Sequence, residues 1–282
     1  MSIEQIIVLA IVQGLTEFLP VSSSGHLILI PALTDWADQG VVVDVMVHVG
    51  SLLAVIAYFW KDVLMLLRGT GHMLRLNWTD EALMAAYIAV ATVPALAFGA
   101  GLKLTGLYEQ IRGDEVVKLI AWNAIIFGVL LYVADLVGRR TKVMENMTMS
   151  PALIIGIAQA MALIPGTSRS GITMTAARFL GFERPEAARF SFLLGIPAIA
   201  AAGGFTAIEA IQLEGALPEG ALLAAGLTFI AALAAIALLM ALVKRFSFLP
   251  FLIYRLALAA LLFALIYEWV PGYSLDGMQS AS

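Results

Sequence analysis

Residues 13–26, Gln-Gly-Leu-Thr-Glu-Phe-Leu-Pro-Val-Ser-Ser-Ser-Gly-His, place a carboxylate, serine hydroxyls and an imidazole inside an otherwise apolar segment. Residues 3–12 and 27–33 on either side are apolar enough to lie in lipid. Pro20 and Gly25 disfavour one continuous helix, so the segment is expected to be helix, break, helix. Broken backbone at membrane depth needs protein or a water-filled cavity to satisfy its amides and carbonyls. We therefore expect a re-entrant hairpin with a functional tip; the alternative is a capped helix of a soluble protein.

The composition is that of an integral membrane protein. Of the 282 residues, 61% are hydrophobic and 13% are charged, and the mean hydropathy is +0.95, whereas soluble domains carry roughly 25% charged residues. The net charge of −4, with 16 Lys and Arg, argues against nucleic acid as a partner, because no basic field large enough for serial phosphate contacts is available. The absence of cysteine excludes disulfides, thiolate metal ligands and thiol nucleophiles.

Further apolar runs are each close to the roughly 20 residues that span a bilayer. They cover residues 42–60, 82–104, 116–137, 188–208, 220–243 and 249–270. The run 150–180 differs, because Pro165 and Gly166 interrupt it near its centre, and it indicates a second hairpin. The predicted fold class is an all-α integral membrane protein with six transmembrane helices and two re-entrant helical hairpins.

The two hairpins repeat each other in sequence. One constant shift aligns identical residues, namely Gln13 with Gln159, Ser22 with Ser168, Ser24 with Ser170 and Gly25 with Gly171. Each half holds one hairpin and an odd number of spans, so the second half is expected to be inverted in the membrane. The predicted domains are a single membrane domain 1–282, comprising a first repeat 1–140, a second repeat 148–272 and a disordered tail 273–282.

The distribution of basic residues predicts the orientation. Most Lys and Arg lie between alternate spans, which would place those segments in the cytoplasm. The segments are 61–81, 138–149, 178–189 and 244–245. We therefore expect both termini to face the exterior, the first hairpin to enter from outside, and the second hairpin to enter from the cytoplasm.

Glu17 is the central acidic group of the first tip. Gln13 and Glu17 are four residues apart, so they share one face of a helix. An acidic group at the bilayer centre costs about 2.5 to 3.5 kcal/mol on insertion scales, so a cation should meet Glu17. The candidates are Arg169 and a divalent ion such as Mg²⁺ or Ca²⁺, for which hard oxygens are suitable ligands. A purely structural Glu–Arg pair is the alternative, and His48, one turn after Asp44, is a further candidate for function.

Hydroxyl groups are concentrated at both tips around a single guanidinium. They belong to Ser22, Ser23, Ser24, Thr167, Ser168, Ser170 and Thr173. The planar fork of Arg169 suits phosphate oxygens, and Gly25, Gly166 and Gly171 would let backbone amides approach an anion. Tight helix packing is the alternative explanation of the serines and glycines. His26 can exchange a proton near neutral pH, so the tips together predict a phosphate-binding site.

The motifs of both tips occur in one order along nearly the whole chain. They are Gln13-x-x-x-Glu17 with Phe18-Leu19-Pro20-Val21-Ser22-Ser23-x-Gly25-His26, Pro165-Gly166-x-Ser168-Arg169-Ser170-Gly171-x-Thr173, Asp44-x-x-x-His48-x-Gly50-Ser51, Phe190-Ser191-Phe192-Leu193-Leu194, and Ser247-Phe248-x-Pro250-Phe251-x-x-Tyr254-Arg255. In this combination the chain resembles the membrane undecaprenyl-diphosphatase (bacitracin-resistance) family of bacteria. Gln13 stands where many members carry a second Glu, which weakens a metal-binding role for this position.

The resemblance implies hydrolysis of undecaprenyl diphosphate to undecaprenyl phosphate and inorganic phosphate, which recycles the lipid carrier of cell-wall synthesis and confers bacitracin resistance. The expected catalytic residues are Glu17, Ser23, His26 and Arg169, with Glu17 also holding the Mg²⁺ or Ca²⁺. The expected substrate-binding residues are Gln13, Ser22, Ser24, Gly25, Gly166, Ser168, Ser170, Gly171 and Thr173. The expected partners are a polyprenyl diphosphate lipid and the bilayer, with a homodimer left open. The expected location is the bacterial plasma (inner) membrane, with the active site facing the exterior.

Two other functions remain open from the sequence. A transporter or flippase of a phosphorylated polyprenyl lipid would also use inverted repeats with broken helices. The unrelated lipid phosphatases with Pro-Ser-Gly-His and Ser-Arg-x-x-x-x-x-His motifs fit less well, because residue 175 is Thr where their nucleophilic histidine would stand. Covalent attack by Ser23 and attack by a water that His26 activates are both compatible with the sequence.

Overall fold

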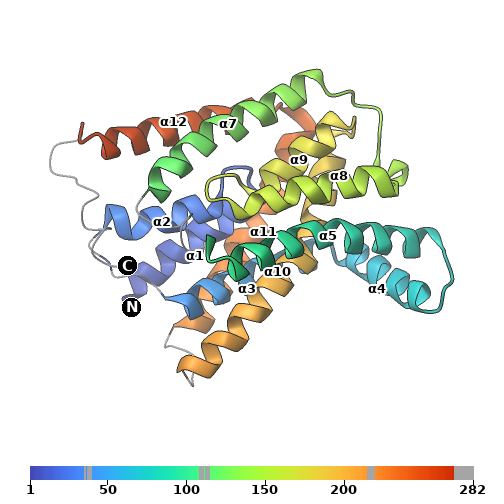
Figure 1. Cartoon of the computed structure of the whole chain (residues 1–282), viewed down its shortest axis with the longest axis horizontal. Helices are drawn as coiled ribbons and strands as arrows, with labels where there is room; N and C mark the ends of the chain where they lie inside the picture. The colour runs from blue at the N-terminus through green and yellow to red at the C-terminus, as the bar shows by residue number, and fades with distance from the viewer. Residues whose placement is uncertain (35, 37–39, 108–110, 112–114, 215–219, 270–282) are drawn as a thin grey trace.

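The computed structural model describes residues 1–34, 36, 40–107, 111, 115–214 and 220–269, and no strand occurs among them (Figure 1). The α-helices are α1 (Ile3–Phe18), α2 (Ser23–Leu33), α3 (Val41–Tyr58), α4 (Trp60–Leu74), α5 (Asp80–Leu104), α7 (Val116–Val137), α8 (Met149–Ala160), α9 (Arg169–Phe179), α10 (Arg184–Glu214), α11 (Ala221–Arg245) and α12 (Leu249–Ile266). Two short 3-10 helices occur at Met144–Asn146 and Met161–Leu163. The all-helical class is therefore confirmed for the described residues, while the predicted tail 273–282 lies outside them.

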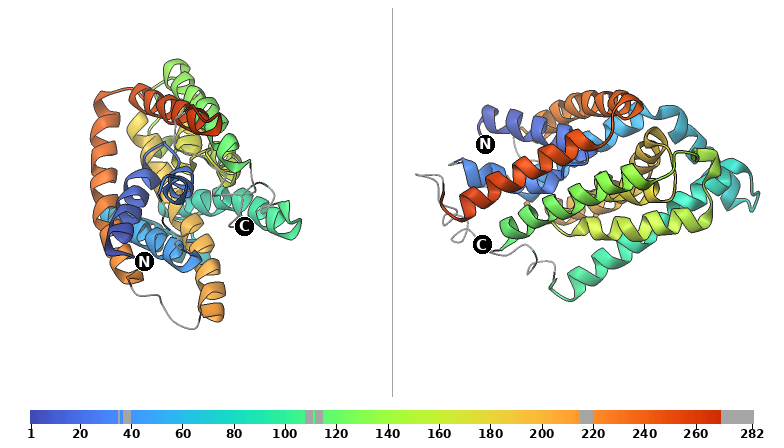
Figure 2. Two further views of the ribbon diagram at one scale, coloured as in Figure 1. Left: turned by 90° about the vertical axis from the view of Figure 1, so that its left-hand side faces the viewer. Right: turned by 90° about the horizontal axis from the view of Figure 1, so that it is seen from above.

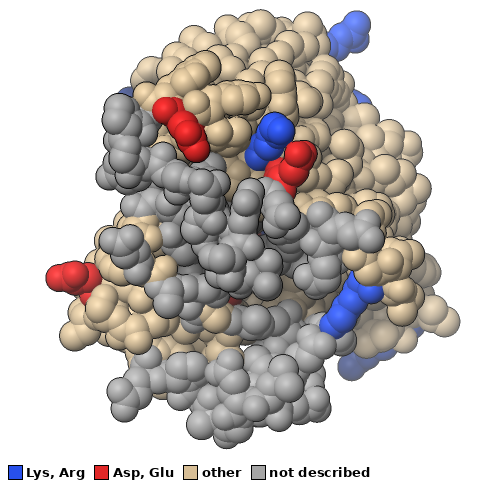
Figure 3. Space-filling model, turned by 60° about the vertical axis from the view of Figure 1, so that its left-hand side comes forward, with Lys and Arg blue, Asp and Glu red and all other residues tan. Residues whose placement is uncertain are grey.

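The long apolar helices correspond to the predicted spans. Five helices, α5, α7, α10, α11 and α12, are long and apolar enough to cross a membrane, and α3 qualifies together with α4, from which it is bent by 90°. The protein is thus a multi-span membrane protein. On the face that Figure 3 shows, the described Asp, Glu, Lys and Arg side chains are scattered among uncharged residues.

The prediction that 61–81 is a loop is wrong, because α4 occupies most of this segment. Charged and apolar residues alternate there at helical spacing, which allows an amphipathic helix after the bend at Phe59. Gly69 of α4 packs directly on the backbone of Glu81 at the start of α5, and α4 lies alongside α5 (Figure 1). Lys61 and Arg68 therefore lie on a helix, and Arg75 directly follows its end.

Close helix packing depends on small residues where backbones meet. Helices α1 and α3 lie against α11, and α8 lies against α5 (Figures 1 and 2). A Cβ at Gly50 of α3 would overlap the carbonyl oxygen of Ala225 in α11, and one at Gly156 of α8 would overlap that of Ala91 in α5. Lipid tails are as apolar as leucine, so such close packing, rather than the hydrophobic effect, holds membrane helices together.

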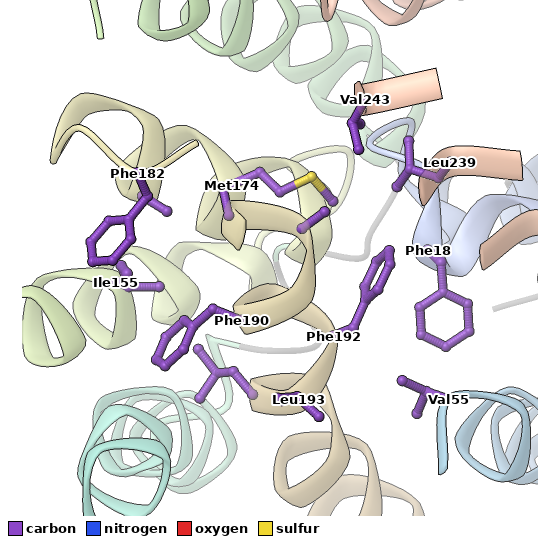
Figure 4. Close-up of a cluster of buried hydrophobic side chains, with 14 of the residues drawn as sticks. Phe18, Val55, Ile155, Met174, Phe182, Phe190, Phe192, Leu193, Leu239 and Val243 are labelled. Atoms are coloured by element: carbon purple, nitrogen blue, oxygen red, sulfur yellow. The ribbon is translucent and has the colours of Figure 1, made fainter. Parts of the chain in front are cut away.

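A cluster of buried apolar side chains supports the first tip (Figure 4). Phe18, the last residue of α1, is fully buried, and its ring meets that of Phe192 in α10 edge to face at 5.2 Å. Such a pair contributes about 0.5–1.5 kcal/mol beyond its buried area. Val55 from α3 and Leu239 from α11 also belong to the cluster. The end of α1 is thus fixed by α3, α10 and α11.

Each tip is a break between two helices, as predicted. The first break lies between Phe18 and Ser23 and contains Pro20. Gly25, however, is the third residue of α2, and Gly171 is likewise the third residue of α9, so neither glycine makes a break. The distortion falls instead on the residues before the helices.

Two serines carry the backbone strain of the breaks. Ser22 has φ 76° and Ser168 has φ 72°, a region that residues with a side chain seldom adopt and that costs on the order of 1–3 kcal/mol. Ser22 and Ser168 are one of the two serine pairs that the sequence shift aligned. Each of these serines directly precedes the first residue of a helix, Ser23 of α2 or Arg169 of α9.

A buried charge network ties α7, α9, α10 and α12 together at a distance from the tips. Asp135 of α7 is fully buried and accepts from Arg178 Nε at 3.1 Å, Arg184 Nε at 2.6 Å and the Phe248 amide at 3.2 Å. Arg178 is itself fully buried. Arg178, one of the basic residues of segment 178–189 on which the predicted orientation rests, is therefore paired inside the protein.

Candidate active site

The carboxylate of Glu17 is the centre of the candidate site. It accepts from Gln13 Nε2 at 3.1 Å and Ser23 Oγ at 2.7 Å, both at Oε2, and from Arg169 Nη2 at 3.2 Å at Oε1. Glu17 is buried, with 8% of its surface exposed. The cation that meets Glu17 in the structure is thus Arg169. His48 Nε2 lies 3.9 Å from Glu17 Oε2, close enough to add positive charge when the ring is protonated.

Four helices position these side chains. Gln13 and Glu17 are one turn apart on α1, Ser23 begins α2, and Arg169 begins α9. Arg169 Nη1 also donates to the carbonyl of Ser191 in α10 at 3.2 Å. The guanidinium is therefore oriented by two fixed acceptors, on α1 and on α10.

Arg255 of α12 holds the two tips against each other. It is fully buried and donates to the carbonyl of Pro20 in the first tip at 3.2 Å, and to those of Gly166 at 2.8 Å and Thr167 at 3.2 Å in the second. Its other donors reach Asn123 and Ala124 of α7. A second link runs from Ser170 Oγ to the carbonyl of Leu19 at 3.0 Å. The tips are thus joined through backbone groups that broken helices leave without helical partners.

Arg255→Lys is expected to lower the melting temperature of the purified protein by several degrees. Lysine keeps the charge but not the fork of five donors, and each buried acceptor left unsatisfied costs about 1–3 kcal/mol. Thermal unfolding in detergent measures the effect. Arg245→Lys, at an exposed position near the end of α11, is the matched control, and equal melting temperatures for the two variants would contradict this role.

The hydroxyl groups that the sequence places at the two tips differ in exposure, although Ser22 of the first tip is buried like those of the second. Ser23 and Ser24 of the first tip are partly exposed. In the second tip, Ser170 and Thr173 are fully buried, and Thr173 Oγ1 lies 2.7 Å from Ser191 Oγ. Ser168, Ser170 and Thr173 therefore bond within the protein, whereas the buried Thr167 Oγ1 has no hydrogen-bond partner among the described residues.

The serine pairs of the two tips have similar geometry but different caps. Ser22 Oγ lies 3.3 Å from Ser24 Oγ, and Ser168 Oγ lies 3.2 Å from Ser170 Oγ. Ser168 Oγ also accepts from the Gly171 amide at 3.2 Å and so caps α9, whereas Ser22 makes no such bond to α2. The first amides of α2 thus lack a side-chain cap.

The predicted glycines lie against other helices. A Cβ at Gly25 would lie 3.1 Å from Ile120 Cγ2 of α7, and a Cβ at Gly166 would lie 2.7 Å from Ile120 Cα. Gly166 also has φ 86°, which few other residues tolerate. Gly171 lies close to Ser168 and Arg255. Packing thus accounts for their small size, and contact with an anion stays a prediction.

His26 is not hydrogen-bonded to the Glu17 group among the described residues. Its Nδ1 lies 2.7 Å from the carbonyl oxygen of Ser22, and its Nε2 lies 2.6 Å from Tyr254 Oη. The two rings are stacked, with centroids 5.7 Å apart. The sequence motif at 247–255 contained both Tyr254 and Arg255, but nothing in its spacing placed them beside the tips.

The donor set around Glu17 fits a divalent cation only if the substrate completes it. Within the described residues, no group of three or more His, Cys, Asp or Glu side chains could hold a metal. The oxygen of the Gln13 amide is buried without a hydrogen-bond partner, and Glu17 offers one carboxylate. Mg²⁺ is commonly held by one or two carboxylates together with substrate phosphates, so these oxygens could serve in that way.

Known proteins match the chain over most of its length. The model of the family described as bacitracin resistance protein BacA matches residues 6–261. A protein of Erythrobacter litoralis (strain HTCC2594) named undecaprenyl-diphosphatase is 48% identical over 284 residues, which cover 94% of this chain and 99% of that protein. Proteins of the same name from Jannaschia sp. (strain CCS1) and Roseobacter denitrificans (strain ATCC 33942 / OCh 114) are 47% and 46% identical, with 95% of this chain and 100% of each protein covered.

Proposed function

The chain belongs to the bacitracin resistance protein BacA family, and we propose that it hydrolyses undecaprenyl diphosphate to undecaprenyl phosphate and inorganic phosphate at Glu17. The observation that carries this assignment is that one carboxylate holds both a serine hydroxyl and a guanidinium, from helices far apart in sequence. A hydrolase of this kind returns the lipid carrier to cell-wall synthesis and confers resistance to bacitracin, as the name of the family implies.

Ser23 is the proposed nucleophile and Glu17 its base. The hydroxyl donates to Glu17 Oε2 at 2.7 Å, so the carboxylate can take the proton as Ser23 Oγ attacks the terminal phosphorus. The bond from phosphorus to the bridging oxygen breaks, and undecaprenyl phosphate leaves with that oxygen. Water then hydrolyses the phosphoserine, and the proton on Glu17 returns to Ser23.

Two positive groups near Ser23, the Arg169 guanidinium and the N-terminus of α2, stabilise the phosphoryl charge in this mechanism. Arg169 shares the Glu17 carboxylate with Ser23, and its guanidinium can bind phosphate oxygens as a fork. The N-terminus of α2, which has no side-chain cap, offers its amides to the same phosphate. Glu17 and Gln13 would hold Mg²⁺ or Ca²⁺ together with the diphosphate, and the ion would neutralise part of its charge.

The proposed topology is an inverted repeat whose two hairpins meet near the bilayer midplane. Ser22 and Ser168 share the same rare backbone conformation, and each is followed by a short helix of equal length. The packing of α1 on α11 mirrors that of α8 on α5. These correspondences support two repeats, and the basic residues outside the Asp135 network support external termini and an active site open to the exterior.

Ser24→Cys tests the direction of access. Ser24 is partly exposed, and the chain has no other cysteine. In intact spheroplasts the variant is expected to react with a membrane-impermeant thiol reagent, because the site opens outward. Thr70→Cys, on the exposed face of α4, is the control and should react only in inverted vesicles. Labelling of residue 24 only in inverted vesicles would show that access is from the cytoplasm.

His26→Ala separates hydrolysis from transport. Binding alone does not require His26, whereas hydrolysis of a phosphoserine needs a proton acceptor for water. The variant is expected to bind undecaprenyl diphosphate with near-normal affinity. Its rate of phosphate release is expected to fall by at least about 10²-fold. Binding and phosphate release are measured on the same purified sample. Unaltered release would favour a transporter or flippase of a phosphorylated polyprenyl lipid.

A further inference from the structure

Tyr254 controls the only ring nitrogen of His26 that can exchange a proton in the observed arrangement. A backbone carbonyl only accepts hydrogen bonds, so His26 Nδ1, 2.7 Å from the oxygen of Ser22, must carry a hydrogen. In the neutral ring Nε2 then has a lone pair and accepts from the Tyr254 hydroxyl at 2.6 Å. When the ring is charged, Nε2 instead donates to the phenol oxygen. The pair can thus pass one proton in either direction.

The positions of His26 and Tyr254 indicate that they do not take part in the first chemical step, the attack of Ser23 on phosphorus. Ser23 is bonded to Glu17, which already provides a base for its hydroxyl. His26 lies one turn further along α2, and its Nε2 faces α12 through Tyr254. Tyr254 is 45% exposed, whereas Glu17 is 8% exposed. Tyr254 is therefore less enclosed by protein than Glu17, which leaves room beside it for a second reactant after the lipid phosphate has left.

We propose that Tyr254 is a catalytic residue that relays a proton from the attacking water to His26 during hydrolysis of the phosphoserine. The water oxygen bonds to phosphorus as one of its protons moves to Tyr254 Oη, and the hydroxyl proton of Tyr254 moves to His26 Nε2. The bond between phosphorus and Ser23 Oγ breaks, and Ser23 takes the proton that Glu17 holds. His26 gives its proton back through Tyr254 to solvent or to the departing phosphate, so no oxidant or co-reactant is needed.

This relay rests on the proposed phosphoserine mechanism, and rapid mixing of undecaprenyl diphosphate with Tyr254→Phe tests it. Phenylalanine keeps the stacked ring and removes the hydroxyl. The variant is expected to form about one undecaprenyl phosphate per enzyme at the wild-type rate, and then to release inorganic phosphate about 10²-fold more slowly, within the range of general acid–base effects. Both products are quantified over time, and the phosphoserine is detected at Ser23 by mass spectrometry.

Matched variants separate the relay from packing. Tyr267→Phe removes a phenol just past the end of α12, where the ring stacks on Phe263, and should leave both steps unchanged. Replacing Tyr254 by 3-fluorotyrosine keeps its shape and hydroxyl but makes the phenol more acidic. This substitution is expected to alter the rate of phosphate release and not that of the first step, a selective change that a packing role would not produce.

Each outcome of the mixing experiment has a definite meaning. Unchanged phosphate release in Tyr254→Phe would overturn the relay, and so would an equal slowing of both products. Slow phosphate release without accumulation of undecaprenyl phosphate would also overturn it, because the hydroxyl would then act before the phosphoserine forms. Failure of the wild-type protein to release phosphate would instead contradict the proposed function itself, so the two failures are distinguishable.

Discussion

Arg169→Lys is expected to reduce the turnover of undecaprenyl diphosphate almost as much as Arg169→Ala does, by about 10³-fold. The guanidinium donates at once to Glu17 and to the carbonyl of Ser191, and its planar fork can still offer donors to the phosphoryl oxygens. Lysine is a point charge with a different reach, so it cannot orient on both acceptors and meet the phosphate bidentately. Loss of a donor to developing negative charge typically costs about 10²–10³ in turnover.

Steady-state phosphate release by the purified variants measures this effect, together with their yield and elution from a sizing column. Arg140→Lys, at an exposed position outside the helices, is the matched control and should keep wild-type turnover. Activity of Arg169→Lys within a few-fold of the wild type would mean that only the positive charge matters at this position, and the bidentate role would be wrong.

Glu17→Gln is expected to lower turnover by about 10³-fold while the protein remains folded. Glutamine has the shape of glutamate, but it cannot take the proton of Ser23, and it leaves Arg169 without its carboxylate. General-base catalysis alone contributes about 10²–10⁴-fold. A cation held by Glu17 and Gln13 would also lose its one charged ligand. The metal dependence of any remaining activity is therefore expected to weaken.

Turnover of Glu17→Gln is measured across a range of Mg²⁺ and Ca²⁺ concentrations, and its fold is checked by circular dichroism. Glu4→Gln provides the control, because Glu4 lies on the same helix in an exposed first turn. Full metal-dependent activity in Glu17→Gln would refute both the base and the metal role.

Local sequence patterns predicted much of the fold. Apolar runs of bilayer length fixed the positions of the long helices, and Pro20 marked the first break. The segment after residue 60 was mistaken for a loop, because its charges suggested solvent although their spacing is helical. Gly25 was mistaken for a helix breaker, since the sequence could not show that the strain falls on Ser22, and on Ser168 in the second tip.

The site was predictable where its members are near in sequence or uniquely charged. Gln13, Glu17 and Ser23 could be grouped from spacing, and the need for a counter-charge brought in Arg169. Tyr254 and Arg255 were out of reach, because α12 meets the tips only through tertiary packing. His26 was expected to exchange a proton near the serines, but the sequence could not show that the fold places a phenol at its free nitrogen.

The central claim, that Glu17 joins Ser23 and Arg169 in one hydrolytic site, is tested most directly by a double-mutant cycle on phosphate release. Purified wild type, Glu17→Gln, Arg169→Ala and the double variant are assayed with a C55 diphosphate in detergent, with and without chelator. We predict that the wild type releases one phosphate per lipid, and that it does so more slowly with chelator. The double variant is expected to be hardly slower than either single variant, because the effects of substituting groups that act as a unit are not additive. Losses that multiply fully in the double variant would show that the two residues act independently and would contradict a shared site.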